Sequence, residues 1–379
     1  MKPFNKASVC LITGSITLAV PAISHANSAE AELGKALYFD TNLSKNRTQS
    51  CATCHNPSHG FVDNRDNGIQ GMASLGDDGH SLGDRHAPTS AYAKFSPKFH
   101  YDSKKKQYIG GQFWDGREDD LVGQAGGPPT NPIEMGMPSK AATVARIEEN
   151  AHYVKQFKSI YGEDVFTDKE SAYGKITQAI AAFEKTDFFA PFDSKYDRYL
   201  RGEVELTDEE AFGEAIFFSP TNVNCSTCHK LNDVARKGET FTNYEYHNIG
   251  VPANLALRAK NGKGNSHIDH GLLENPAVTA AEHDGKYKVP TLRNIAITAP
   301  YMHNGVFQKL ETVVEFYDQF NNPQRKLNPE TDKPWGAPEV NATVNRKDLK
   351  AKRISDKKVK ALVAFMKTLT DKRYEHLLK

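Results

Sequence analysis

The chain has 379 residues, of which 38% are hydrophobic, 10% aromatic and 25% charged, and its formal net charge is +1. These fractions are typical of a folded globular protein and exclude a disordered chain. The near-neutral charge argues against nucleic acid or an anionic membrane as a partner, because both are bound through an excess of Lys and Arg. The length is enough for two domains of ordinary size.

The first 26 residues have the pattern of a cleavable signal peptide. Lys2 and Lys6 precede an apolar run over residues 7–20, and Ser24-His25-Ala26 places small residues where signal peptidase cleaves. The run is shorter than the about 20 residues that a membrane-spanning helix needs, so we predict cleavage after Ala26 and no transmembrane segment afterwards. The protein is therefore expected to be exported to the periplasm.

Cleavage also removes Cys10, and the four remaining cysteines all lie in two Cys-x-x-Cys-His pentads, at residues 51–55 and 225–229. This spacing is that of covalent c-type haem attachment, and its repetition favours haem over a disulfide within the motif. Each thiol adds across a haem vinyl group, and the histidine then ligates the iron. We predict two haem c cofactors, held by Cys51, Cys54 and His55 and by Cys225, Cys228 and His229.

A diverged repeat precedes the two pentads. Residues 33–39 (LGKALYF) and 212–218 (FGEAIFF) each predict a short amphipathic helix that leads into a haem site. Thr207 and Glu210 have the spacing of a capping box, which marks the start of the second unit. We predict a mainly α fold of two cytochrome c-like haem domains with long loops, over residues 27–205 and 206–379.

The remaining segments alternate between loops and helices. Residues 56–90 and 321–347 are rich in Gly, Pro, Asn and Asp and predict long loops. Helical periodicity over residues 140–186 and after Ser355 predicts helices in both halves. Their apolar faces comprise Ile176, Ile180 and Phe183 in the first and Val359, Leu362, Val363, Met366 and Leu369 in the second.

Two haems alone do not distinguish an electron carrier from an enzyme. An electron carrier fills both axial positions of each iron, whereas peroxide chemistry needs an open iron site with acid–base groups beside it. Residues 112–117 (QFWDGR), Gln124, Pro128 and residues 131–136 (NPIEMG) supply candidate groups in a loop rich in Gly and Pro.

Together with the pentads, this segment resembles the bacterial di-haem cytochrome c peroxidase and MauG superfamily, and the likeness covers nearly the whole mature chain. The resemblance implies that Trp114 lies between the haems as an electron relay, with Gln124, Pro128 and Glu134 around the peroxide pocket of the N-terminal haem. A carboxylate such as Glu134 suits acid–base catalysis, because cleavage of bound peroxide moves a proton from the near oxygen to the departing one. Outside this motif, Trp114 would be interpreted as a core residue and Glu134 as a solvated carboxylate.

Residues 289–317 contain a second stretch that resembles the superfamily. In its peroxidase branch a methionine at the position of Tyr317 completes the C-terminal haem, and in its MauG branch a tyrosine does. A thioether favours reduced iron, whereas a phenolate favours higher oxidation states. We therefore expect His229 and Tyr317 to hold a haem that stores oxidising equivalents. The alternative is that Tyr317 packs within its helix and that Met302 or His303 is the ligand.

The resemblance also implies a calcium ion between the haems, bound in part by the backbone carbonyls of Thr298 and Pro300. The asparagine that contributes to this site in the family, next to the arginine matching Arg85, falls on His86 in this chain. Imidazole is a poor ligand for calcium, so the chain departs from the family at this point.

Three further histidines lie near the predicted sites. His80 is in the loop that carries a displaceable distal ligand in many peroxidases of the family, but it is out of register, and we expect an exposed loop histidine. His247 matches a segment packed near the second haem, where it contacts a propionate or is structural. His303 is expected to hydrogen-bond near Tyr317.

The leading hypothesis is an exported di-haem peroxidase that reduces hydrogen peroxide at the N-terminal haem, with electrons passed through the C-terminal haem and Trp114. Tyr317 favours a MauG-like enzyme that oxidises an aromatic residue of a partner protein. The alternative is a cytochrome c peroxidase that removes peroxide with a small c-type cytochrome as donor. A non-catalytic di-haem electron carrier is the third hypothesis, and a pocket with Gln124 and Glu134 argues against it.

Overall fold

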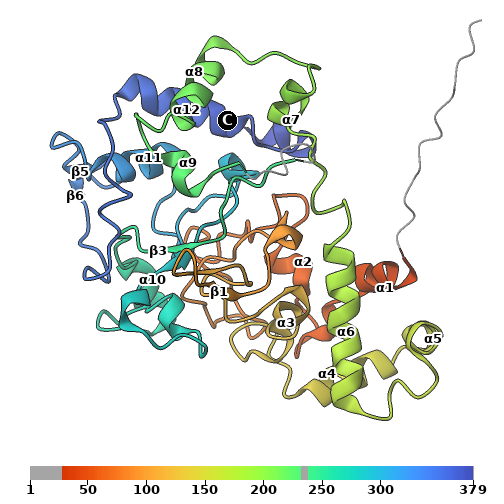
Figure 1. The fold of residues 1–379 in the computed structure, drawn as a ribbon. Helices are drawn as coiled ribbons and strands as arrows, with labels where there is room; N and C mark the ends of the chain where they lie inside the picture. The colour runs from red at the N-terminus through yellow and green to blue at the C-terminus, as the bar shows by residue number, and fades with distance from the viewer. Residues whose placement is uncertain (1–27, 232–237, 379) are drawn as a thin grey trace, which may run out of the picture.

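The computed structural model describes residues 28–231 and 238–378. The predicted signal peptide, residues 1–26, lies outside the described residues. The described part of the chain is mainly helical, as predicted, and its named strands form short two-stranded antiparallel ladders (Figure 1). None of the described helices is long and apolar enough to cross a membrane.

The helices and strands are named here in chain order. The α-helices are α1 (Ala29–Tyr38), α2 (Cys51–Cys54), α3 (Leu121–Ala125), α4 (Lys140–Glu148), α5 (Ala151–Tyr161), α6 (Lys169–Glu184), α7 (Lys195–Leu200), α8 (Asp208–Phe217), α9 (Cys225–Cys228), α10 (Leu255–Asn261), α11 (Leu310–Asp318) and α12 (Asp356–Lys367). The strands are β1 (His100–Asp102), β2 (Gln107–Ile109), β3 (Tyr246–His247), β4 (Tyr287–Lys288), β5 (Leu327–Asn328) and β6 (Lys333–Pro334), and they pair β1 with β2, β3 with β4 and β5 with β6.

Each half is built around one pair of crossed helices. α1 lies across α6, and α8 lies across α12, in different parts of the molecule (Figure 1). The crossing points are glycines: a Cβ atom on Gly34 would overlap the carbonyl oxygen of Ala179, and one on Gly213 would overlap that of Ala361. Gly34 and Gly213 have the same place in the repeated segments, so the repeat encodes the same close crossing twice.

Two hydrophobic cores surround these crossings. The first contains buried residues from Leu33 to Ala190, and the second contains buried residues from Tyr196 to Leu369. α7 packs into the second core although it precedes the predicted boundary between residues 205 and 206, and that boundary stays a prediction. The end of the chain returns to the first half, where the Tyr374 hydroxyl donates to the carbonyl of Pro57 at 2.6 Å.

The expected helices and loops fit this architecture. Residues 140–186 contain α4, α5 and the whole of α6, as the periodicity predicts. Thr207 and Glu210 form the capping box of α8. α12 begins after Ser355, although the serine side chain accepts no capping hydrogen bond. Residues 56–90 contain no helix, and residues 321–347 contain only the β5–β6 hairpin.

Gly34→Ala and Gly213→Ala are each expected to lower the free energy of unfolding by about 1–3 kcal/mol, because the added Cβ meets a backbone carbonyl. Gly174→Ala is a matched control on α6, since this glycine is exposed and a Cβ would meet no atom within 4 Å. The control is expected to stabilise by about 0.5–1 kcal/mol through helix propensity. Denaturant unfolding of the haem-loaded protein measures the free energy of unfolding of the three variants. Similar changes in this free energy for all three would contradict the close crossing of the helices.

Candidate active site

The two predicted haem histidines are held in the same way. The Nδ1–H group of His55 donates to the carbonyl of Phe61 at 3.2 Å, and that of His229 donates to the carbonyl of Phe241 at 3.0 Å. Because a carbonyl only accepts, this bond keeps the proton on Nδ1 and leaves Nε2 free to bind a metal. Burial lowers the pKa of both rings, that of His229 to about 4, so both are neutral imidazoles.

The two accepting carbonyls are oriented by residues with an unusual backbone conformation. Phe61 and Phe241 are fully buried and have φ angles of 57° and 53°, in the left-handed region that residues other than glycine rarely adopt. A threonine hydroxyl binds the preceding carbonyl in each case, from Thr89 at 2.6 Å and from Thr291 at 2.7 Å. The same device therefore orients both histidines.

An arginine covers each of these phenylalanine rings. The guanidinium of Arg373 lies 5.2 Å from the centre of the Phe61 ring, and that of Arg293 lies 5.3 Å from the Phe241 ring. Arg293 is 1% exposed and forms a bidentate ion pair with Asp197 at 2.5 and 2.8 Å. It also lies 5.2 Å from the ring of Tyr92, a core residue of the first half, so the second site is supported partly from the first.

These supports were missed because the loops after the pentads differ in length. Phe61 follows His55 by 6 residues, whereas Phe241 follows His229 by 12, so the repeat loses its register. The available signal was a Pro-Thr pair at residues 88–89 and again at residues 290–291. Their threonines are the two hydroxyl donors, and their proline carbonyls lie beside the two histidine rings.

The cysteines of each pentad form a single turn of helix, α2 or α9. The two cysteines of a turn are three residues apart and lie on one helix face, and the backbone N–H of the following histidine closes the turn at 2.9 Å. All four described cysteines are free thiols, and none of them forms a disulfide. Two thiols on one face beside a neutral imidazole fit the covalent attachment of a haem.

Trp114 is hydrogen-bonded to backbone close in sequence to the proline of each histidine site. Its indole Nε1–H donates to the carbonyl of His86 at 2.8 Å, two residues before the proline of the first site. Its own carbonyl accepts from the N–H of Lys288 at 2.9 Å, two residues before the proline of the second site. The half-buried indole is thus tied to backbone of the first site and the Trp114 carbonyl to backbone of the second, while its role as a relay stays a prediction.

Glu134 lies beside the first histidine site. Burial, Asp63 and Glu134 raise the pKa of the Cys54 thiol to about 11, despite the opposing effect of Arg65, which places the Glu134 carboxylate near this cysteine. Burial raises the pKa of Glu134 itself, and the Arg117 guanidinium opposes this rise. A carboxyl group with a raised pKa exchanges a proton closer to neutral pH, as acid–base catalysis requires.

Gln124 and Pro128 lie on the segment that leads to this carboxyl group. Gln124 is a half-buried residue of α3. Pro128 begins the 3-10 turn Pro128–Thr130, and its carbonyl accepts from the N–H of Met135 at 3.2 Å, so the chain folds back beside Glu134. The sequence-predicted pocket residues therefore share one compact loop.

At the second site, Tyr317 faces the cysteines. It lies on α11, and burial together with the Cys228 and Cys225 thiols raises the pKa of its hydroxyl. His303 instead stacks on Tyr287 with ring centres 3.6 Å apart, and its buried Nε2 has no hydrogen-bond partner in the described structure. The expected hydrogen bond of His303 near Tyr317 stays a prediction, and Met302 packs at the edge of the second core.

The donors expected for calcium fit that ion poorly. His86 is 5% exposed, its Nε2 has no partner among the described residues, and burial lowers its pKa to about 4. A neutral imidazole thus replaces the asparagine oxygen, which leaves the carbonyls of Thr298 and Pro300. No cluster of three His, Cys, Asp or Glu side chains suited to a metal occurs in the described ranges. Calcium stays a prediction, and no catalytic step is assigned to it.

Two other histidines have the surroundings that the sequence suggested. The His80 side chain is 81% exposed and lies 3.3 Å from the Asp78 carboxylate, as expected of a loop histidine. His247 lies near the second haem attachment, since its ring interacts with Cys228 and Glu245. Its Nδ1 is 3.1 Å from the side-chain nitrogen of Asn345.

Glu184 is a buried carboxyl group that the sequence patterns did not single out. It ends α6, is 4% exposed, and its Oε2 has no hydrogen-bond partner in the described structure. Burial raises its pKa to about 8. Its charge influences Cys51 and Tyr38, so it is a second buried carboxyl group near the first pentad.

Glu184→Gln is expected to change the pH dependence of stability. The pKa of Glu184 rises from 4.5 to about 8 on folding, so the folded state prefers the protonated form. The stability that this preference contributes is complete below pH 4.5 and is lost as the pH rises through about 8. Between these pH values the free energy of unfolding of the wild type should fall by on the order of a few kcal/mol, and that of Glu184→Gln should fall by less. Denaturant unfolding at several pH values measures the difference, with the exposed Glu163→Gln as a control that should follow wild type.

The comparisons with known proteins agree with this geometry. A family model described as di-haem cytochrome c peroxidase matches residues 28–205. The chain is 49% identical over 359 residues to the methylamine utilization protein MauG of Paracoccus denitrificans, covering 93% of this chain and 91% of the relative. It is 31% identical over 360 residues to the cytochrome c551 peroxidase of Nitrosomonas europaea, covering 93% and 83%.

A solved structure extends this likeness to the fold. The diheme peroxidase BthA from Burkholderia thailandensis matches with a TM-score of 0.83 and 31% identity, covering 93% of this chain and 88% of that chain. The two relatives and the solved structure each cover 93% of the chain, which includes both pentads. The chain therefore belongs to the di-haem cytochrome c peroxidase family and is an oxidoreductase that acts on peroxide.

Proposed function

We propose that this protein is a periplasmic, MauG-like peroxidase that reduces hydrogen peroxide at the His55 site and takes electrons from an aromatic side chain of a partner protein. The observation that carries the choice of branch is Tyr317, whose hydroxyl lies near Cys225 and Cys228. A phenolate oxygen at this place favours oxidised iron, as the oxidation of a partner requires. The 49% identity to MauG supports the same branch.

The residues of the chain have separate tasks in this reaction. Haems bound through the two pentads supply the electron-transfer chemistry. Glu134 takes a proton from the near oxygen of peroxide and returns it to the departing oxygen, while Gln124 orients the peroxide and Pro128 limits the space around it. One peroxide, two protons and two electrons give two waters. The electrons come from the partner's aromatic residue and pass through the His229 site and Trp114.

A cytochrome c peroxidase with a small c-type cytochrome as electron donor is the second candidate. The 31% identity to a cytochrome c551 peroxidase, over 93% of this chain, favours it. This candidate keeps the roles of Glu134 and Trp114 and differs in the donor. A plain electron carrier would not need the acid–base group that Glu134 supplies.

Adding peroxide to the diferric enzyme without a reductant tests the branch. A MauG-like enzyme is expected to form a long-lived near-infrared absorption band. Tyr317→Met should shorten the lifetime of the oxidised species that gives this band by about tenfold or more, because a thioether favours reduced iron. The control variant Tyr199→Phe, at the edge of the second core, should leave this lifetime unchanged. A requirement for prior reduction, followed by rapid turnover with a reduced small cytochrome, would establish the second candidate.

Glu134→Gln is expected to lower kcat for peroxide reduction by about 10²–10⁴-fold, because the amide cannot transfer the proton. The ferric absorption spectrum should stay unchanged, since neither histidine is altered, and Glu134→Asp should restore part of the rate. The exposed Glu163→Gln is the control for loss of a carboxylate. A kcat within about threefold of wild type for Glu134→Gln would remove Glu134 from the mechanism.

A further inference from the structure

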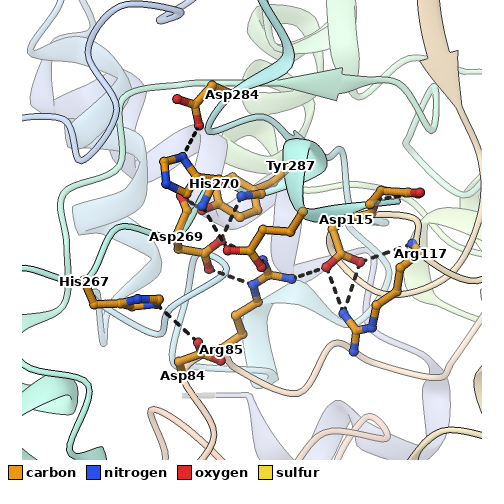
Figure 2. A network of polar contacts seen from close by, with 12 residues as sticks. Asp84, Arg85, Asp115, Arg117, His267, Asp269, His270, Asp284 and Tyr287 are labelled. Atoms are coloured by element: carbon orange, nitrogen blue, oxygen red, sulfur yellow. Dashed lines mark hydrogen bonds and ion pairs between the residues drawn. The ribbon is translucent and has the colours of Figure 1, made fainter. Parts of the chain in front are cut away.

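Arg85 is the centre of a buried ion-pair cluster that joins distant segments of the chain (Figure 2). Its Nε and Nη2 donate to the two carboxylate oxygens of Asp269 at 2.7 and 2.6 Å, and its Nη1 donates to Asp115 at 2.6 Å. Nη2 also reaches Glu274 at 2.9 Å. The side chains of Arg85, Asp115 and Asp269 are only 12%, 2% and 5% exposed. A guanidinium is the group suited to such a fork of contacts, since an ammonium offers a single charged centre.

The contacts of Arg85 fall next to both hydrogen bonds that Trp114 makes with the described residues. Arg85 precedes His86, whose carbonyl accepts the indole N–H at 2.8 Å. Asp115 directly follows Trp114. The Arg85 guanidinium also lies 5.8 Å from the ring of Tyr287, which precedes the residue whose N–H binds the Trp114 carbonyl. The Arg85 side chain therefore links the three backbone segments that determine where the indole lies, namely residues 85–86, 114–115 and 287–288.

The cluster also ties these segments to the second half of the chain. The Tyr287 hydroxyl donates to the carbonyl of Asp269 at 3.1 Å, so β4 and the Asp269 segment are joined beside the guanidinium. Figure 2 shows Arg85 between Asp115 on one side and Asp269 on the other, with Tyr287 beside them. Loss of the guanidinium would leave two buried carboxylates facing each other, and the segments would separate to admit water.

We propose that Arg85 is a positioning residue for Trp114: it holds the indole N–H against the His86 carbonyl and thereby keeps the indole in one orientation between the two histidine sites. The proposal rests on the relay role of Trp114 in the proposed function. Electron transfer through a side chain depends steeply on its distance and orientation, so a small rotation of the indole would slow it. Arg85 itself contacts neither the peroxide loop residue Glu134 nor either haem histidine through a described hydrogen bond.

The experiment measures the indole directly in the diferric holoenzyme. The chain has two tryptophans, so a Trp335→Phe background leaves Trp114 as the single indole. Ultraviolet resonance Raman spectroscopy then reports the strength of the indole N–H hydrogen bond, and deuterium exchange reports how well it is protected. In Arg85→Gln the band is expected to shift to a weaker hydrogen bond, with exchange at least about tenfold faster, and Arg85→Lys should recover only part of the protection.

Electron transfer between the two haem sites is the second readout. It is expected to slow by about tenfold or more in Arg85→Gln, as measured by flash photolysis of the mixed-valence enzyme. Arg198→Lys is the matched control for Arg85→Lys, because Arg198 is 18% exposed and pairs with Glu375, which is no part of the Arg85 cluster. Glu274→Gln tests the periphery of the cluster, since Glu274 is 41% exposed and its loss should change both readouts little.

Wild-type Raman bands and wild-type electron-transfer rates in both Arg85 variants would overturn the proposal. Equal changes in Arg198→Lys would also overturn it, because they would show a general loss of stability. If Arg85→Gln does not fold, Asp115→Asn removes one arm of the fork and must weaken the indole hydrogen bond for the proposal to hold. The relay itself is tested separately: unchanged electron transfer in Trp114→Phe would contradict the proposed function, while the Raman response of the Arg85 variants would still measure positioning.

Discussion

The hydrogen bond from a histidine Nδ1–H to a strained backbone carbonyl is the interaction on which both sites depend. It fixes the tautomer of His55 and of His229, and it requires Phe61 and Phe241 to adopt positive φ angles. Such backbone costs on the order of 1 kcal/mol or more and persists only where surrounding contacts determine it. Those contacts are a threonine hydroxyl and a covering arginine, and both occur twice.

The two sites are alike on the side of the histidine and unlike on the other side. The first faces a loop with Gln124 and Glu134, and the second faces Tyr317 on α11. Burial raises the pKa of Glu134 and of Tyr317 above their ordinary values. The repeated half of each site thus holds a histidine in the same way, and the different residues opposite it fit the unequal roles proposed for the two sites.

Local features of the fold could be predicted from the sequence, and long-range ones could not. The pentads, the capping box of Thr207 and Glu210 and the apolar face of α6 follow from spacings of three or four residues, which the geometry of a helix determines. The family resemblance supplied Trp114, Glu134 and Tyr317. The Arg85 cluster escaped prediction because its partner Asp269 is 184 residues away. The stacking of His303 on Tyr287 was not predicted either, because it too depends on tertiary packing.

Arg293 has a consequence for how the two halves lose their structure. It lies over the Phe241 ring of the second site and against Tyr92 of the first core, and Tyr92 in turn donates a hydrogen bond to Asp371 near the C-terminus. Opening of either half would break the contact between the buried guanidinium and the Tyr92 ring, which joins the two cores. The halves are therefore coupled thermodynamically, and the chain should melt in a single cooperative transition despite its two cores.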